Sequence, residues 1–253
     1  YHLRIACRER RPRRSGGRKP AIFTELPPSA VGTPGTAFPT VRFNDKVKNM
    51  EKIKNKTQVL PTRMVLTEHA ESEGNLLEPN YLQAGFSEAK CCIIHSGGFV
   101  LLDFGKELNG GIIITTQNVS GRGQNCRIVF GESVMEALSD IGYKNATNDH
   151  AVRDMTVELV PMSTMRFGNT GFRFVNIETV GATITLKSIC ALTDIKDIEY
   201  KGSFQCNDEL LNKIWETGAY TVHLNMHEYL WDGIKRDRLV WVGDMHPEVS
   251  TWV

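Results

Sequence analysis

The sequence predicts a mainly β protein, an antiparallel β-sandwich followed by one long helix and an acidic loop. Short β-branched and aromatic runs recur at regular spacing between Gly and Asn turns, which is typical of a sandwich. No helix-length apolar stripe separates these runs, so an alternating βαβ fold is disfavoured. Near residue 206 the apolar period changes from two to that of a helix.

Composition places the chain among ordinary globular proteins. Its 253 residues are 41% hydrophobic and 23% charged, enough for one large domain or two smaller ones with a real core. The net charge of +1 gives the molecule no overall attraction for nucleic acid or an anionic membrane. The longest apolar runs are too short to cross a bilayer. We therefore expect neither nucleic acid nor a membrane as partner, and the oligomeric state stays open.

The six cysteines show no C-x-x-C spacing, and their density is too low for a disulfide scaffold. We expect them to be scattered small apolar residues in a reducing compartment. Neither a zinc ribbon nor a thioredoxin-type site is predicted. No cofactor and no metal are expected.

Residues 1–60 are expected to be disordered or misassigned. Residues 8–20 form a basic run rich in Pro and Gly, and residues 27–39 lack apolar periodicity. Neither stretch can bury enough apolar surface to offset its ordering entropy. A nucleic-acid-binding or nuclear-localisation arm is one alternative for the basic run. A transit peptide is another, although Glu9 and the prolines argue against its amphipathic helix.

The first residue is Tyr1, so Met50 is a plausible true start. No apolar stretch typical of a signal peptide is visible. The compartment therefore stays open between cytoplasm and periplasm.

Residues 61–200 are predicted to form the β-sandwich. One of the expected strands, around Phe174, alternates with period two: its phenylalanines share one face, whereas Arg173, Val175 and Ile177 share the other. Gly105 is expected to end the first strand. The expected strands cover residues 99–104, 111–119, 126–131, 155–160, 172–178, 182–192 and 198–204.

A helix is predicted to begin after Asn207, which is a good N-cap, because Asp208 and Glu209 then suit the positive end of the helix dipole. The helix should run to about His227. One helix and a loop cannot make an independent domain, so this segment either folds back onto the sandwich or opens a helical domain. The residues at helical spacing are Leu210, Leu211, Ile214, Trp215, Gly218, Thr221, Val222 and Asn225.

The acidic loop spans residues 231–244. Carboxylates brought together and buried have raised pKa values, and enzymes use such groups to donate a proton near neutral pH. Aromatic rings beside them suit the apolar face of a sugar. An exposed loop with ordinary ion pairs is the alternative. The loop contains the acids Asp232, Asp237 and Asp244, the cations Lys235, Arg236 and Arg238, and the flanking Trp231 and Trp241.

Three other motifs give weaker support for a functional site. His223 and His227 have the i, i+4 spacing of a zinc pair, but no third ligand has suitable spacing. Residues 121–124 form a Gly-rich turn between strands, which favours a hairpin over a phosphate loop. Ser96-Gly97-Gly98 and Gly131-Glu132-Ser133 lack the G-x-S-x-G pattern of a serine hydrolase.

The stretch from Asp232 to Asp244, DGIKRDRLVWVGD, resembles the signature of bacterial α-L-rhamnosidases, glycoside hydrolases that remove terminal L-rhamnose. Residues 204–215 and 245–248 are similar to the entry into that family's (α/α)6 barrel. Upstream, residues 130–132, Asp154 and residues 171–175 resemble the β-sandwich that precedes the barrel. The resemblance implies that residues 201–253 begin an (α/α)6 catalytic domain that this chain holds only in truncated form.

The resemblance also implies roles for single residues. Asp237 would be the general acid, and Asp232 and Asp244 would hydrogen-bond rhamnose hydroxyls. Arg236 would hold sugar and carboxylates together, and Trp241 would pack on the sugar ring. The acid is commonly Glu in this family, so Asp237, one methylene shorter, must be brought nearer to its substrate.

Inverting glycosidases need a second carboxylate to activate water, and in this family it lies farther downstream. Glu248 is too close in sequence to serve with confidence, so this chain alone is expected to be inactive on a rhamnose-containing glycoside. A non-catalytic carbohydrate-binding or structural sandwich, contacting glycan through residues 142–145, is the alternative. A different specificity on the same barrel is a third hypothesis.

Overall fold

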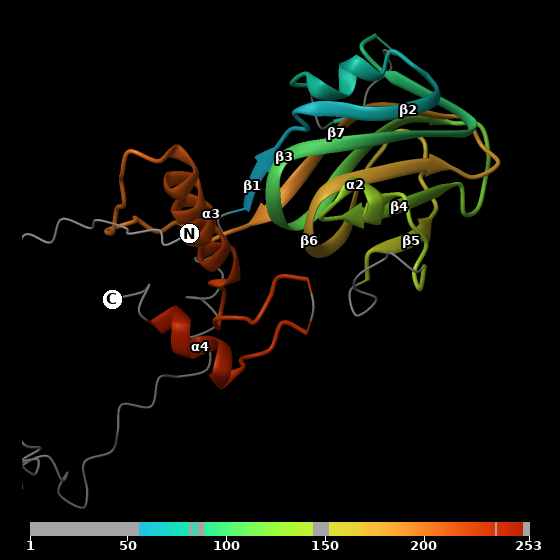
Figure 1. Ribbon diagram of the computed structural model, residues 1–253. Helices are drawn as coiled ribbons and strands as arrows, with labels where there is room; N and C mark the ends of the chain where they lie inside the picture. The colour runs from blue at the N-terminus through green and yellow to red at the C-terminus, as the bar shows by residue number, and fades with distance from the viewer. Residues whose placement is uncertain (1–55, 81–82, 85–88, 144–151, 236, 250–253) are drawn as a thin grey trace, which may run out of the picture. The chain divides into compact units, whose positions relative to one another are not determined.

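The computed structural model describes residues 56–80, 83–84, 89–143, 152–235 and 237–249 (Figure 1). All of them fall within one compact unit, Val47–Val253. Residues 1–55, with the basic run and Met50, lie outside the described part. The expectation that residues 1–60 lack regular structure is corrected at its end, where Lys56–Val59 form a strand that pairs with residues 191–194.

The described strands form one antiparallel sheet in the order β1-β7-β3-β6-β4-β5, with β2 paired to β3 (Figure 1). The mainly β, antiparallel class predicted from the sequence is therefore confirmed. The strands are β1 (Lys56–Val59), β2 (Arg63–Glu71), β3 (Cys92–Val119), β4 (Cys126–Gly131), β5 (Asp154–Val157), β6 (Ser163–Thr179) and β7 (Ile184–Asp194).

Strand β3 is long enough for both of its ends to pair with the same part of β7. Leu186 of β7 is paired with Cys92 on one side and with Thr116 on the other. The sheet therefore folds over itself and encloses a core. The predicted break at Gly105 is wrong: this glycine, at φ 84°, lies in a register shift within β3, and the strand continues through it.

Aromatic and β-branched side chains fill the core. The ring of Phe172 meets those of Phe104 and Phe130 edge to face, with centroids 5.6 and 5.0 Å apart. Phe172 shares this core with Val175 and Ile177, whereas Phe174 packs elsewhere. The predicted common face for the two phenylalanines is therefore wrong, because β3 shifts register opposite them, between Asp103 and Leu108.

Two sequence expectations for the loops are also corrected. Residues 198–204 form no strand; instead the Tyr200 hydroxyl lies 2.9 Å from Nδ1 of His223, so this stretch meets a helix rather than a sheet edge. Residues 121–124 do not close a hairpin, because β6 lies between β3 and β4 in the sheet. In both cases the local sequence pattern suits a strand or a hairpin turn, but the segment does not pair with the neighbouring strand that such a structure needs.

The described helices are η2 (Glu73–Leu77), α2 (Val134–Ala137), α3 (Glu209–Asn225) and α4 (Val242–Val249). Asp208, not Asn207, caps α3: its carboxylate accepts hydrogen bonds from the backbone N–H groups of Leu210 and Leu211, at 2.9 and 3.4 Å. None of these helices combines the length and apolarity needed to cross a membrane.

Candidate functional site

The acidic loop is closed on itself at its base. The backbone N–H of Asp232 donates to the carbonyl of Leu239 at 2.9 Å, and the N–H of Leu239 donates back to Oδ1 of Asp232 at 3.0 Å. The residues between them form a bend, which includes Arg238 at φ 53°. Arg236, a predicted site residue, lies outside the described residues. The loop is thus a defined structure rather than an open link between α3 and α4.

Two carboxylates of the segment lie within electrostatic reach of a third, that of Glu248. The pKa of Glu248 is raised by burial and by the negative charges of Asp244 and Asp232. Asp244 stands in the first turn of α4, where the positive helix end favours an anion. Asp237 is exposed on the bend. The structure therefore brings Asp232 and Asp244 together with Glu248, and it presents Asp237 to solvent.

The two tryptophans have different environments. The Trp231 ring stacks on His227 with centroids 4.1 Å apart, and the Arg238 guanidinium lies 5.1 Å from the Trp231 ring centroid. Trp231 therefore helps to hold the loop. Trp241 is 50% exposed, so a large part of its surface is free to meet a sugar ring.

The two histidines make contacts within the protein. His223 places Nε2 2.7 Å from the carbonyl oxygen of Lys196. His227 is buried, with Nε2 2.8 Å from the carbonyl oxygen of Leu224, and burial lowers its pKa. In the part of the chain that the structure describes, no group of three His, Cys, Asp or Glu residues is arranged to hold a metal ion.

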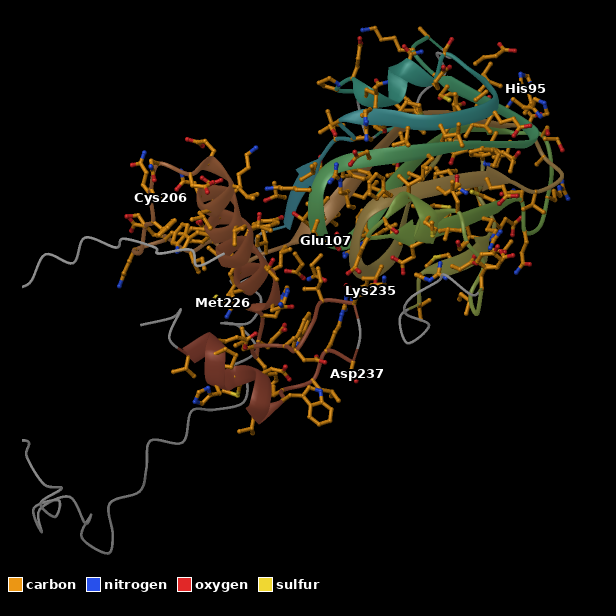
Figure 2. All side chains as sticks on the ribbon, viewed as in Figure 1. His95, Glu107, Cys206, Met226, Lys235 and Asp237 are labelled. Carbon is orange, nitrogen blue, oxygen red and sulfur yellow. The ribbon has the colours of Figure 1, made fainter. Side chains whose placement is uncertain are left out.

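A buried charge cluster, which was not predicted from the sequence, links the loop to α2 and the sheet region; Figure 2 labels two of its members, Lys235 and Glu107. The ammonium group of Lys235 contacts the carboxylate of Glu136 on α2 and lies 3.4 Å from Oε2 of Glu132. Arg153, fully buried, places its Nε 3.6 Å from the same Glu136 carboxylate. The side chain of Lys235, which in the sequence is one of three cations of the acidic loop, therefore points into the protein.

Glu107 of β3 belongs to the same cluster. Its pKa is raised to about 8, mainly by burial and also by the negative charges of Glu132 and Glu136, with the charge of Lys235 acting against the rise. Its Oε1 is buried and has no hydrogen-bond partner among the described residues. At pH 7 this carboxyl group is therefore mainly protonated.

Two further contacts fasten the loop. The guanidinium Nη2 of Arg238 donates to Oδ1 of Asn109 at 3.1 Å and to the carbonyl of Asn169 at 2.9 Å. Ile234 is buried against Gly171, where an added Cβ would stand only 2.6 Å from its Cγ1. A residue larger than glycine at position 171 would thus displace the side chain of Ile234.

One signal for this cluster was present in the sequence. Ser133-x-x-Glu136 is the pattern of a capping box. The backbone N–H of Glu136 donates to Oγ of Ser133 at 3.2 Å, and its carboxylate accepts from the N–H of Glu132 at 2.9 Å. The pattern could have predicted α2, but nothing in it indicates Lys235, which is 99 residues away.

The family-like residues of the sheet have structural partners. Arg173 donates to both carboxylate oxygens of Asp103, at 2.8 and 2.9 Å, and these hydrogen bonds lower the pKa of Asp103 to about 2. Asp154 is paired with Arg127 at 2.6 Å. These side chains stabilise the sheet and leave the candidate chemistry to the acidic loop.

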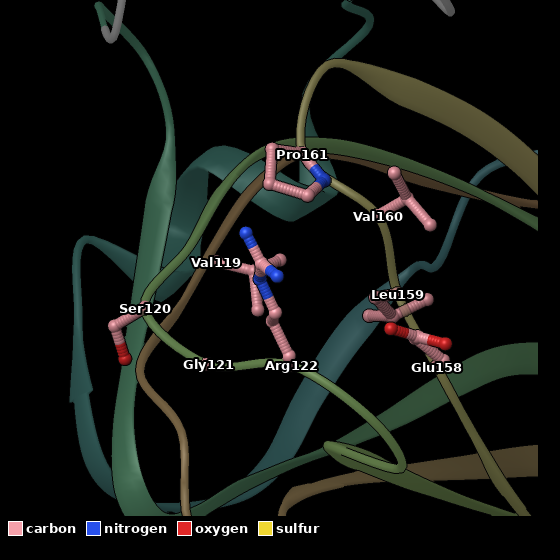
Figure 3. Close-up of a pocket in the computed structure, with 8 residues that line it drawn as sticks. All are labelled: Val119, Ser120, Gly121, Arg122, Glu158, Leu159, Val160 and Pro161. Carbon is pink, nitrogen blue, oxygen red and sulfur yellow. The ribbon is translucent and has the colours of Figure 1, made fainter.

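A separate hollow of about 550 Å³ lies on the sheet (Figure 3). None of the acidic-loop residues lines it. Its walls come from the C-terminal end of β3 with the residues that follow it and from the segment after β5, and they combine apolar side chains with one cation and one anion. The lining residues are Val119, Ser120, Gly121, Arg122, Glu158, Leu159, Val160 and Pro161.

Residues 199–252 match the family model of the bacterial alpha-L-rhamnosidase 6 hairpin glycosidase domain. An alpha-L-rhamnosidase of Formosa agariphila is 33% identical over 81 residues, which are 32% of this chain and 8% of that protein. The resemblance predicted from the sequence is therefore confirmed. The chain spans less than a tenth of the length of this curated relative.

Solved structures show the same fold. A rhamnosidase from Klebsiella oxytoca, solved with rhamnose bound, has a TM-score of 0.55 and 18% identity over 81% of this chain and 42% of its own. A GH78 rhamnosidase from Bacillus sp. GL1 has a TM-score of 0.52 and 21% identity over 70% of this chain and 18% of its own. At these identities the likeness is one of fold.

Proposed function

We propose that this chain belongs to a glycoside hydrolase that removes terminal α-L-rhamnose from glycosides or polysaccharides by an inverting acid/base mechanism. The observation that carries the proposal is the match of residues 199–252 to the rhamnosidase six-hairpin domain, because this range contains the whole acidic loop. The proposed substrate is a rhamnose-containing glycoside.

The proposed domains are a sheet domain over residues 61–200 and the start of an (α/α)6 domain over residues 201–253. The exposure of Leu210, Leu211 and Ile214 on α3 supports the second. Helices of such barrels pack against neighbouring helices, so a row of exposed apolar side chains is expected on a first helix.

The proposed chemistry assigns one step to Asp237. Its carboxylic acid donates a proton to the glycosidic oxygen as the bond from that oxygen to the anomeric carbon breaks. A water molecule attacks the opposite face of that carbon and loses its proton to a general base. The exposed position of Asp237 on the bend supports access to a bound substrate.

The other loop residues would hold the sugar. Asp232 uses Oδ1 for the N–H of Leu239, which leaves Oδ2 for a sugar hydroxyl. Asp244 would accept from a second hydroxyl, and the half-exposed ring of Trp241 would pack on the apolar face of the sugar. Arg236 keeps the role that the resemblance implies.

We also propose that this chain alone does not turn over substrate. An inverting reaction needs a second carboxylate as general base, and Glu248 shares the short helix α4 with Asp244, a residue proposed to bind the sugar. Incubation of the chain with 4-nitrophenyl α-L-rhamnoside should release no nitrophenol. Measurable release that is lost in Glu248→Gln would contradict this assignment.

The test of the function uses the natural protein that contains this chain. Asp237→Asn should lower kcat on nitrophenyl rhamnoside by about 10²–10⁴-fold, the usual contribution of a general acid, with an unchanged circular dichroism spectrum. Asp197→Asn, which changes an exposed carboxylate outside the loop, is the matched control. A normal kcat in Asp237→Asn would refute the role of Asp237.

The alternative, a non-catalytic carbohydrate-binding module, predicts a different result. The natural protein would then bind L-rhamnose in calorimetry without turnover, and Asp237→Asn would leave that binding unchanged.

A further inference from the structure

The bend that carries Asp237 is fastened to the sheet on both sides of this residue. Lys235, two positions before it, reaches Glu136 and Glu132. Arg238, one position after it, reaches Asn109 and the backbone of Asn169. The described contacts thus fix Lys235 and Arg238, one on each side of the exposed acid.

The Lys235 contact is an unusual way to fasten a loop. Lys235 is 5% exposed and Glu136 is 3% exposed, so both charges have lost their water. Such a buried pair is often no more stabilising than apolar residues of the same size, because desolvation offsets the attraction. What it does supply is a defined position, since a buried ammonium group is stable only beside its carboxylates.

The charges around Lys235 are balanced by several elements. Glu107 faces it from β3, Glu132 follows β4, Glu136 lies on α2, and Arg153 precedes β5. With Glu107 protonated, two cations face two carboxylates. These groups, named here the Lys235 socket, together form a charge-balanced binding position for one ammonium group.

We propose that Lys235 is a positioning residue for Asp237: its contacts with Glu136 and Glu132 of the sheet region set where the bend holds the acid. The inference rests on the function proposed above. Asp237 is one methylene shorter than a glutamate, so its carboxyl group depends more strongly on where the backbone lies. A fixed position for Lys235 next to it therefore has a physical reason. A displacement of about 1 Å at a catalytic group can cost roughly 10²-fold in rate.

The first measurement is hydrogen exchange of this chain by mass spectrometry. Lys235→Met keeps the stem and removes the charge. Exchange of the amides in residues 231–240 should become at least about tenfold faster, while the amides of β4 keep their rates. Lys201→Met, at an exposed lysine, is the matched control and should change neither segment.

The second measurement is steady-state kinetics of the natural protein. Lys235→Met should lower kcat by about 10–100-fold, because the acid is displaced from the glycosidic oxygen. Lys235→Arg, which keeps the charge, should recover part of kcat. A purely structural role would instead lower the amount of folded enzyme and leave kcat per folded molecule unchanged.

A milder variant covers the case in which Lys235→Met does not fold. Glu132→Gln removes only the partner at 3.4 Å, whose side chain is half exposed. It should speed loop exchange and lower kcat in the same direction, but by less. Unchanged loop exchange in both variants, or equal acceleration in the loop and β4, would overturn the inference. Absence of rhamnosidase activity in the wild-type natural protein would instead refute the proposed function, since loop exchange is measured without substrate.

Discussion

The sheet region, residues 56–194, and the helical segment, residues 199–249, differ in how their apolar side chains are covered. In the sheet region the large side chains of Phe104, Phe130 and Phe172 are fully buried. In the described helical segment the buried apolar side chains are Leu224 and Ile234. Val242 at the start of α4 is 81% exposed.

This difference separates the source of stability from the source of chemistry. The sheet region is held by its own core, whereas the acidic loop is held to that region by a few polar contacts and by the buried side chain of Ile234. Functional side chains are often found on such segments, since a rigid scaffold can position them without burying them. The following variants test whether the two regions differ as this comparison requires.

The largest expected difference is between two core truncations. Phe172→Ala should lower the free energy of unfolding by about 3–5 kcal/mol, because it leaves a cavity among well-packed rings. Leu224→Ala should cost only about 2 kcal/mol, at the low end for a buried leucine, because most of the α3 side chains around it are exposed or half-buried. Urea denaturation measures both, and Val180→Ala, at an exposed position, should change the value by less than about 0.5 kcal/mol. Equal losses in the two core variants would break the comparison.

A smaller effect concerns the junction between the regions. The pKa of Glu107 is raised from 4.5 to about 8, so the folded state binds more protons than the unfolded chain between these values. Its contribution to stability is therefore complete below about pH 4.5 and is lost as the pH rises through 8. Glu107→Gln should match the wild type at pH 4.5 and exceed it by about 2–4 kcal/mol at pH 9.

Urea denaturation at pH 4.5, 7 and 9 checks this expectation. Glu68→Gln, at an exposed carboxyl group of β2, is the matched control. A Glu107→Gln variant whose stability follows the wild type at every pH would show that Glu107 is not held in a buried, protonated state.

The smallest effect concerns the start of α3. Asp208→Ala removes the side chain that accepts from two backbone N–H groups and should cost about 1 kcal/mol, the usual value of an N-cap. Asn207→Ala should change the stability little. The circular dichroism signal at 222 nm, followed during heating, separates them. If Asn207→Ala lost more stability than Asp208→Ala, Asn207 would be the N-cap, as the sequence predicted.

Sequence patterns predicted those elements that are determined by residues close to one another in the sequence. Strand β4 was predicted at its observed bounds, Cys126–Gly131, because its alternation ends at a glycine. The acidic loop was also singled out from neighbouring residues, and two of its acids, Asp232 and Asp244, each act on the charge of Glu248. The continuation of β3 through Gly105 was missed, because a glycine at a bend and a glycine at a strand end look alike in sequence.

The socket for Lys235 could not be predicted in this way. Glu132 was considered only within a motif that lacks the serine-hydrolase pattern and within a stretch that resembles the family's β-sandwich, and Glu107 was not singled out at all. Their contacts with Lys235 depend on the folding of the sheet, which brings together residues about a hundred positions apart. A single sequence carries no periodic signal at that separation.

The length of β3 has a consequence for the order of folding. Its first residues pair with β7, as in the pairing of Cys92 with Leu186. Residues almost a hundred positions apart in the sequence must therefore meet before the sheet is complete. Contacts of such long range form slowly, because loop closure precedes any gain from pairing. Glu107 and Asn109 lie in the middle of this strand, and the acidic loop docks on them. We therefore expect the loop to reach its final geometry only after the sheet has closed, so that a chain with an incomplete sheet presents no organised acid.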